Sequence, residues 1–275
     1  MLWRFILFGC LILGFLPQSR AAHIVGGELT YRCVGNGQYI FTMKVYRDCF
    51  SGGADFDPQA AMTIYAVNNS TNQSSLFFNL SVPRGAVFDI ETELSPCITA
   101  PPNICVEGTT YETGVVNLPI DTNTTYVISY QRCCRNNTIT NIDNPQDAGA
   151  TYTVSISPEA QVLCNSSPVF TDFPPTVICA NFPLFYDHSA VDADGDQLVY
   201  EFCAPRLGGG IFGTADNPGD PNAFNGVMPD PAAPPPYPPV NFVLPNFSPT
   251  NPMGGDPQVT IDPATGSITG TPTIQ

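Results

Sequence analysis

The chain has 275 residues, and acidic residues outnumber basic ones 24 to 9, which gives a formal net charge of −15. This charge argues against nucleic acid or an anionic membrane as a partner. Proline (29) and glycine (23) are frequent, and aromatic residues make up 11% of the chain. The composition therefore predicts an all-β protein with long loops, and the length leaves room for two domains.

Residues 1–21 have the pattern of a secretory signal peptide. Arg4 provides the positive start, residues 5–16 form an apolar core, and Ser19–Ala21 resembles a small-residue cleavage site. No other apolar run approaches the ~20 residues that span a bilayer. We therefore expect a secreted, extracellular protein without a transmembrane segment in its mature form. Attachment to the cell surface would require regions outside this chain.

Residues 22–163 are predicted to form a disulfide-braced β-sandwich. Polar turns rich in Asn, Gly and Pro separate about six segments of strand-like alternation, at residues 39–46, 62–67, 76–82, 113–118, 126–130 and 152–156. Such a series of short strands is typical of a sandwich.

Nine cysteines follow the signal peptide, and in an exported protein disulfides are their expected state. A zinc site is disfavoured because the sequence has no Cys-x-x-Cys pair. We expect a local bridge between Cys97 and Cys105. The adjacent Cys133 and Cys134 should reach two different partners. The odd count leaves one thiol over and is one reason to expect that the chain is a fragment.

The alternation stops near residue 164, and residues 164–175 are predicted to be a linker because they are rich in Asn, Ser, Pro and Asp. A second sandwich, cadherin-like or immunoglobulin-like, is predicted over residues 176–275. It contains a long Pro/Gly-rich loop at 204–239, in which Pro234–Tyr237 should form a polyproline II spacer. Strands are expected at residues 183–186, 198–203, 240–244, 258–261 and 267–269. A repeat of this kind would still need its last strands after residue 275, which is a second reason to expect a fragment.

Three aspartates alternate in the loop of this second module: Asp192, Asp194 and Asp196, with Gly195 allowing a sharp turn. Carboxylates that converge on one point repel each other unless a cation is present, so the pattern predicts calcium. Ca²⁺ takes 6–8 oxygen ligands, so Asp187, backbone carbonyls and water would complete the shell of a structural site.

Two alternatives bear on this calcium site. An EF-hand is excluded, because the sixth loop position is Gln197 instead of Gly and the twelfth is Cys203 instead of Glu. An Asx-rich turn that binds nothing stays open, since Asp and Gly also dominate ordinary turns.

No catalytic motif emerges from the chain. Residues 23–28 look like the mature start of a trypsin-like protease, but no Gly-Asp-Ser-Gly setting follows, and His188 is the one other histidine. A nucleophile elbow and a phosphate-binding glycine loop are also missing from the sequence. We therefore do not expect an enzyme.

Four sequence blocks carry a resemblance to a known group of proteins. They are His-Ile-Val-Gly-Gly-Glu (23–28), Tyr-Arg-Asp-Cys (46–49), Gln-Arg-Cys-Cys-Arg-Asn-Asn-Thr (131–138) and Phe-Pro-Pro-Thr-Val-Ile-Cys (173–179). These blocks resemble the amino-terminal region of large secreted surface proteins of gliding bacteria. Separately, the aspartate loop and residues 261–272 resemble cadherin-like or immunoglobulin-like repeats. The resemblance implies a gliding-motility-associated protein of type IX secretion, a repeat protein that acts in cell adhesion.

We thus expect a non-enzymatic secreted or cell-surface structural or adhesion module with a calcium-stabilised repeat. Its partners would be other surface proteins or extracellular polysaccharide. The alternative is the ancillary carbohydrate-binding region of a secreted polysaccharide-degrading enzyme, in which Phe224, Tyr237 and Phe247 would stack on sugar rings. Exposed, coplanar rings would favour this alternative, and buried rings would favour the adhesion module.

Overall fold

The computed structural model describes residues 24–50, 55–91, 104–132, 135–145, 148–207 and 234–273. These residues confirm the all-β prediction: their main element is one large antiparallel sheet, and their one α-helix is the short α2 (Pro158–Leu163). The sheet contains eight strands, β1 (Ile24–Gly35), β2 (Gln38–Asp48), β3 (Gln59–Asn68), β4 (Gln73–Asp89), β5 (Val106–Glu112), β6 (Val116–Asn117), β7 (Thr124–Arg132) and β8 (Ala150–Ile156). Their order is β1-β2-β5-β4-β3-β7-β8, with β6 beside β2.

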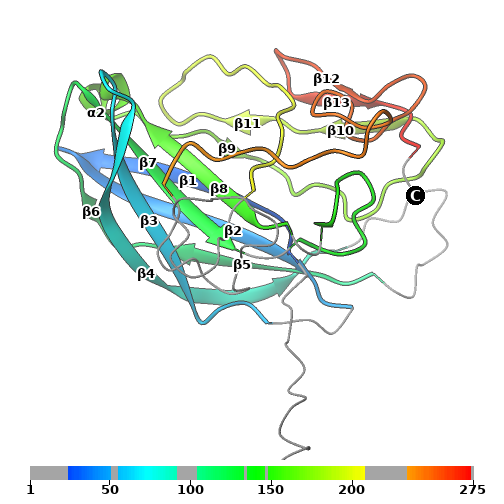
Figure 1. Cartoon of the computed structure of the whole chain (residues 1–275), viewed down its shortest axis with the longest axis horizontal. Helices are drawn as coiled ribbons and strands as arrows, with labels where there is room; N and C mark the ends of the chain where they lie inside the picture. Colours follow the sequence, from blue (N-terminus) through cyan, green and yellow to red (C-terminus); the bar gives the residue numbers. More distant parts are fainter. Residues whose placement is uncertain are drawn as a thin grey trace, which may run out of the picture.

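The sheet curls around a single core (Figure 1). The long strand β4 joins the two halves, because it pairs with β3 along one part and with β5 along the other. The two end strands, β1 and β8, approach each other: a Cβ built on Gly27 would lie 3.1 Å from the ring of Tyr152. Rings of β5, β7 and β8 stack in a row inside the curl, with centroids 6.3 Å apart for Tyr111 and Tyr130 and 6.4 Å apart for Tyr130 and Tyr152.

Period-2 alternation explains the core. Along β2, Tyr39, Phe41, Met43 and Val45 are buried, and the residues between them are more exposed. The strands predicted at 39–46, 62–67, 76–82, 126–130 and 152–156 are all present. Within 113–118 only β6 forms, and neither β1 nor β5 was predicted. The first half of β4 differs in its exposure, since its apolar side chains Leu76 and Phe78 face solvent.

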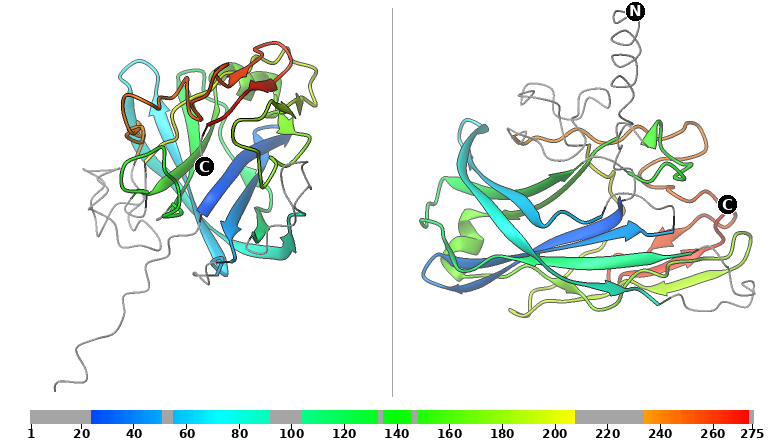
Figure 2. Two further views of the ribbon diagram at one scale, coloured as in Figure 1. Left: turned by 90° about the vertical axis from the view of Figure 1, so that its right-hand side faces the viewer. Right: turned by 90° about the horizontal axis from the view of Figure 1, so that it is seen from below.

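The second half of the chain forms two small sheets beside the large one (Figure 2). One has the order β10-β13-β12, from β10 (Leu184–Asp187), β12 (Thr260–Ile261) and β13 (Ser267–Gly270); in the other, β9 (Val169–Phe170) pairs with β11 (Ala190–Val191). The prediction of strands at 198–203 and 240–244 is wrong. Those residues have no continuous ladder, although Phe242 forms an isolated bridge with Ile142.

The predicted linker, residues 164–175, contacts the large sheet. Cys164 forms a disulfide with Cys33 of β1. The Ser167 amide donates to the Tyr31 carbonyl over 2.9 Å, and the Ser167 hydroxyl accepts from the Tyr31 amide over 2.8 Å. Farther on, Phe173 packs edge-to-face on Tyr46 of β2, with centroids 5.7 Å apart.

The predicted Cys97–Cys105 bridge is wrong, because Cys105 is bonded to Cys49. Antiparallel pairing places Asp48 of β2 opposite Val106 of β5, so the next residues face each other with their Cα atoms 5.1 Å apart. Cys97, Cys133 and Cys134 lie outside the described residues. Cys179 is also disulfide-bonded, and Cys203 is an exposed free thiol.

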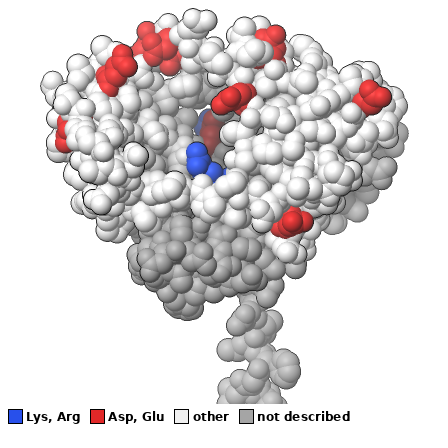
Figure 3. All heavy atoms as spheres, turned by 45° about the horizontal axis from the view of Figure 1, so that its top comes forward, with Lys and Arg blue, Asp and Glu red and all other residues white. Residues whose placement is uncertain are grey.

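Within the part of the chain that the structure describes, no helix has the length and apolar character needed to cross a membrane. The face shown in Figure 3 carries scattered acidic groups, and the basic groups visible there lie at a central hollow, where acidic groups are also seen. This distribution agrees with the acidic excess of the sequence.

Candidate functional site

The aspartate loop follows β11 and is organised by its first carboxylate. Oδ1 of Asp192 accepts the backbone N–H groups of Asp194 (2.9 Å) and Asp196 (3.1 Å). Gly195 has a φ of +82° with open space around it, so the loop turns in a backbone conformation that favours glycine. This is the hydrogen-bonding pattern of an Asx turn.

The other two loop carboxylates hold the loop against the Cys33–Cys164 disulfide. Oδ2 of Asp194 accepts from the Ser166 amide over 2.6 Å, and Oδ2 of Asp196 accepts from the side-chain amide of Asn165. The negative charges of the loop also affect Tyr31 of β1. Burial raises the pKa of Tyr31 to about 12, and the loop carboxylates add to the rise. The aspartate loop is therefore anchored to the residues that directly follow Cys164.

The structure does not gather the four predicted calcium ligands. Asp187 lies on β10, where its Oδ1 accepts from the Ser189 amide over 3.1 Å. No three of these aspartates bring carboxylate oxygens within 4.8 Å of one another. Calcium would have to draw Asp194 and Asp196 away from their present hydrogen-bond donors. The calcium site stays a prediction.

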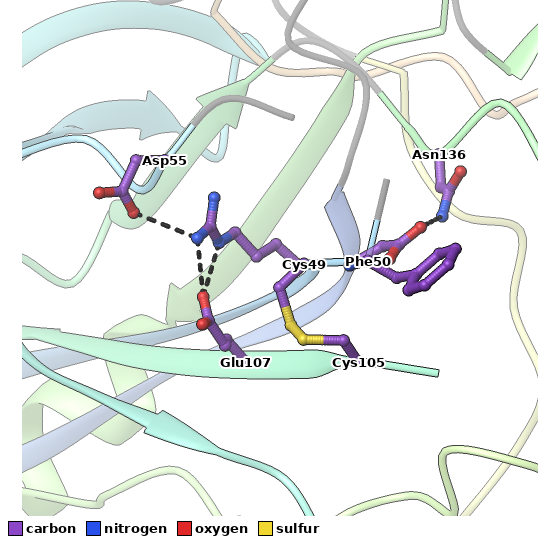
Figure 4. Close-up of a disulfide and its surroundings, with 8 residues drawn as sticks. Cys49, Phe50, Asp55, Cys105, Glu107 and Asn136 are labelled. Carbon is purple, nitrogen blue, oxygen red and sulfur yellow. Dashed lines mark hydrogen bonds and ion pairs between the residues drawn. A yellow bond between two sulfur atoms is a disulfide. The ribbon is translucent and has the colours of Figure 1, made fainter. Parts of the chain in front are cut away.

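One group of three potential ligands does lie within 4.8 Å among the described residues, formed by Cys49, Cys105 and Glu107. It is not a metal site, because both sulfurs belong to the disulfide and no thiolate is available. Figure 4 shows the interactions around the Cys49–Cys105 disulfide. Glu107 forms an ion pair with Arg47, in which Oε2 lies 2.7 Å from Nη2, and the Asp48 carboxylate accepts from the side-chain amide of Asn136 over 3.0 Å. The cluster braces β2 against β5.

A different site forms where β1 and β2 meet residues 169–174. This cavity, termed here the glycine cavity, has a volume of about 340 Å³ and is lined by Gly26, Gly27, Glu28, Tyr46, Phe170, Asp172, Pro174 and His188. Beside it lies an acidic hollow of about 660 Å³, lined by Asp89, Ile90, Glu91, Asp172, Phe173, Pro175, Phe185, Tyr186 and Asp187. Asp172 belongs to both.

Gly26 of β1 leaves open space, and aromatic rings form a wall of the cavity. A Cβ on Gly26 would meet only the ring of Tyr46, at 3.5 Å. The rings of Phe170 and His188 stack in parallel, with centroids 4.1 Å apart and planes 9° apart. Nδ1 of His188 lies 3.3 Å from the hydroxyl of Tyr186, which orients the imidazole.

The electrostatics of the glycine cavity centre on Glu28. Its Oε1 forms an ion pair with Lys44 at 2.6 Å, whereas its Oε2 is buried without a hydrogen-bond partner in the described structure. Burial lowers the pKa of His188, against the pull of Glu28 and Asp187, so the imidazole is neutral at pH 7. Burial also raises the pKa of Tyr46, and the Glu28 charge adds to the rise.

The sequence blocks that carry the resemblance meet at this cavity. The first block contributes Gly26 to Glu28, the second Tyr46 and the last Pro174. The remaining block supports them, since the Asn136 amide donates to the Ile24 carbonyl over 3.1 Å at the start of β1. The sequence analysis identified these blocks but did not predict that they border a common cavity. The available signal was a pair of glycines directly before an acid within a strand.

Comparison of the chain with family models, with curated proteins and with solved structures finds no match.

Proposed function

We propose that the protein is a non-enzymatic, secreted or cell-surface structural or adhesion module. The observation that carries the proposal is the Cys33–Cys164 disulfide, which closes a span of 131 residues. It fixes β1 to the segment whose Ser166 amide donates to the aspartate loop. Disulfides of this kind belong to oxidising compartments. A braced scaffold that presents loops and cavities is suited to binding.

In this proposal, the two parts of the chain correspond to immunoglobulin- or cadherin-like sandwich modules of a gliding-motility-associated, type IX-secreted protein. Partners would be surface proteins or extracellular polysaccharide. Intact mass of exported protein tests the secretion step: loss of residues 1–21 or 1–22 is expected, and retention of Met1 in the exported form would contradict it.

The carbohydrate-binding alternative is less well supported. Tyr237 is only 5% exposed and Phe247 is half-buried, while Phe224 lies outside the described residues. Buried rings do not offer the flat exposed faces that stack on sugars.

Calcium binding at the aspartate loop is the part of the proposal that melting experiments address. The mature chain, residues 22–275, is heated in millimolar calcium and in chelator. Binding to the folded form alone would add about 2.7 kcal/mol at 100 times the dissociation constant. We expect Asp194→Asn to abolish the calcium response.

Asp262→Asn is the matched control. Asp262 also organises an Asx turn, accepting the amides of Ala264 (2.9 Å) and Thr265 (2.8 Å), but it lies outside the aspartate loop. This variant should keep the full response. An unchanged wild-type melting temperature in millimolar calcium would show that the loop is only a turn.

A further inference from the structure

Two strand edges of the large sheet are covered by other parts of the chain. On the side of β1 away from β2, the Ser167 amide donates to the Tyr31 carbonyl over 2.9 Å. On the side of β8 away from β7, Thr151 forms a bridge with Arg206. Such cover keeps the backbone groups of an edge from pairing with another chain.

The first part of β4 has an edge without this cover. β4 pairs with β3 from Gln73 to Pro83, and it pairs with β5 only from Arg84 to Asp89. Between Gln73 and Leu80, a stretch termed here the β4 edge, the side away from β3 therefore has no partner strand in the part of the chain that the structure describes. A strand directs N–H and C=O groups to both of its sides, so the β4 edge offers a row of hydrogen-bonding groups.

Apolar side chains are exposed along the same stretch. Leu76 is 58% exposed and Phe78 is 53% exposed. Phe77 lies between them at a bulge of β4 against β3, and it is 40% exposed although its ring packs on Tyr126 with centroids 5.3 Å apart. Successive exposed apolar side chains of this size mark a binding surface. An added β-strand fits it, because such a strand hydrogen-bonds to the edge and covers the side chains.

The β4 edge also lacks charge. The sequence of residues 73–82 is Gln-Ser-Ser-Leu-Phe-Phe-Asn-Leu-Ser-Val, and the first proline and the first charged residue of β4 are Pro83 and Arg84. Exposed edges of soluble proteins usually carry charges or proline that prevent pairing. In β4 these residues appear only where the pairing with β5 begins. The open part of the strand is therefore left without the usual protection.

The charge of the whole chain indicates which strand is added. The formal net charge is −15, so two copies repel each other unless the surfaces that meet are neutral. The β4 edge is neutral and can pair with itself, because an antiparallel pair of identical strands is related by a two-fold axis. A basic partner attracted by the net charge would need acidic groups on the surface that it binds, and residues 73–82 contain none.

We propose that the protein forms a two-fold symmetric dimer in which the β4 edges of two copies pair as antiparallel strands. The large sheets of the two copies then form one continuous sheet, and the exposed apolar side chains of one β4 edge pack against those of the other. This inference goes beyond the proposed function and does not depend on it, since neither secretion nor calcium takes part in the contact.

Sedimentation equilibrium of the mature chain, residues 22–275, across the micromolar range tests the proposal. Cys203→Ser is used throughout, so that the exposed thiol cannot link two copies. The mass should rise from one copy to two. Sodium chloride should preserve or strengthen the association, because salt screens the repulsion between acidic copies. A monomer at every concentration, a mass above two copies, or a dimer that salt dissociates would overturn the proposal.

Two variants locate the interface. Leu76→Lys and Phe78→Lys each bring two ammonium groups together at the contact, so each should weaken the association at least tenfold. Phe185→Lys is the matched control, because it changes the net charge equally at a ring that is 74% exposed on β10 of a small sheet. It should dimerise as the wild type does. Melting curves identify the folded variants, and wild-type association in either folded β4 variant, or an equal loss in Phe185→Lys, would refute the interface.

Discussion

At Gly27 the backbone of β1 comes so close to β2 that no side chain fits. A Cβ would lie 2.7 Å from the Lys44 carbonyl oxygen and 2.9 Å from Cε of Met43. We expect Gly27→Ala to destabilise the protein by about 1–3 kcal/mol through overpacking, measured by urea unfolding.

The neighbouring glycine is the control for this prediction. Gly26→Ala meets only one ring carbon at ordinary contact distance, so its stability should stay within about 0.5 kcal/mol of the wild type. Equal losses in the two variants would contradict the packing explanation.

Arg132 and Asp57 form a buried ion pair, with side chains 9% and 14% exposed. Removing one partner leaves the other charge buried alone, so Arg132→Met should cost about 3–5 kcal/mol at pH 7. Arg84→Met is the control, because Arg84 pairs with the exposed Asp55 and should lose less than about 1 kcal/mol.

The pH dependence of the Arg132→Met loss has a definite sign. Burial raises the pKa of Asp57, and the Arg132 charge opposes the rise. Without Arg132, the folded chain holds a proton that the unfolded chain releases, so the variant gains stability relative to the wild type as the pH falls through the raised pKa. Urea unfolding at pH 7 and pH 4.5 measures this difference. A loss that stays constant between the two would show that the Asp57 charge is not its cause.

At the scale of elements, two disulfides fasten strands that are distant in sequence. Cys33–Cys164 closes a span of 131 residues, and Cys49–Cys105 closes one of 56. Replacing either pair by serine should cost about 2–5 kcal/mol, and the longer span should cost about 0.7 kcal/mol more in the chain-entropy model.

Denaturant unfolding of the two double-serine variants measures these losses. Because Cys164 precedes the segment that holds the aspartate loop, the Cys33/Cys164 variant should also speed hydrogen exchange at the Ser166 amide. The Cys49/Cys105 variant should leave that amide protected. Equal exchange rates of the Ser166 amide in the two variants would show that the aspartate loop does not depend on the Cys33–Cys164 disulfide.

At the scale of the whole molecule, Phe173 joins the two parts of the chain. Its ring lies 5.7 Å from that of Tyr46 and 5.9 Å from that of Phe88, both on the large sheet. Phe173→Ala should therefore separate one cooperative unfolding transition into two, with the part that contains β10 to β13 melting first.

Scanning calorimetry measures this separation. Phe185→Ala is the matched control, since this ring is 74% exposed and should contribute little to cohesion. Two transitions in the control, or one unshifted transition in Phe173→Ala, would refute a coupling role for Phe173.

Local pattern accounts for the parts of the fold that the sequence predicted well. Alternation at 39–46 and 126–130 identified β2 and β7, because side chains of a strand point to opposite faces whatever it pairs with. The same logic failed at 198–203, where alternation is present but no neighbouring strand completes a ladder. The Cys97–Cys105 prediction failed for a related reason. It rested on the short separation of the two cysteines in the sequence, whereas the register of β2 on β5 places Cys105 opposite Cys49.

The sequence by itself determined the all-β class, the acidic surface and most strands of the large sheet, since each follows from composition or from a two-residue period. Only the tertiary structure decided that residues 164–175 lie on the sheet and that Glu28, Tyr46 and His188 border one cavity. Contacts over such separations depend on strand register and on how the sheet curls. Those are properties of the whole packed core, which no short segment encodes alone.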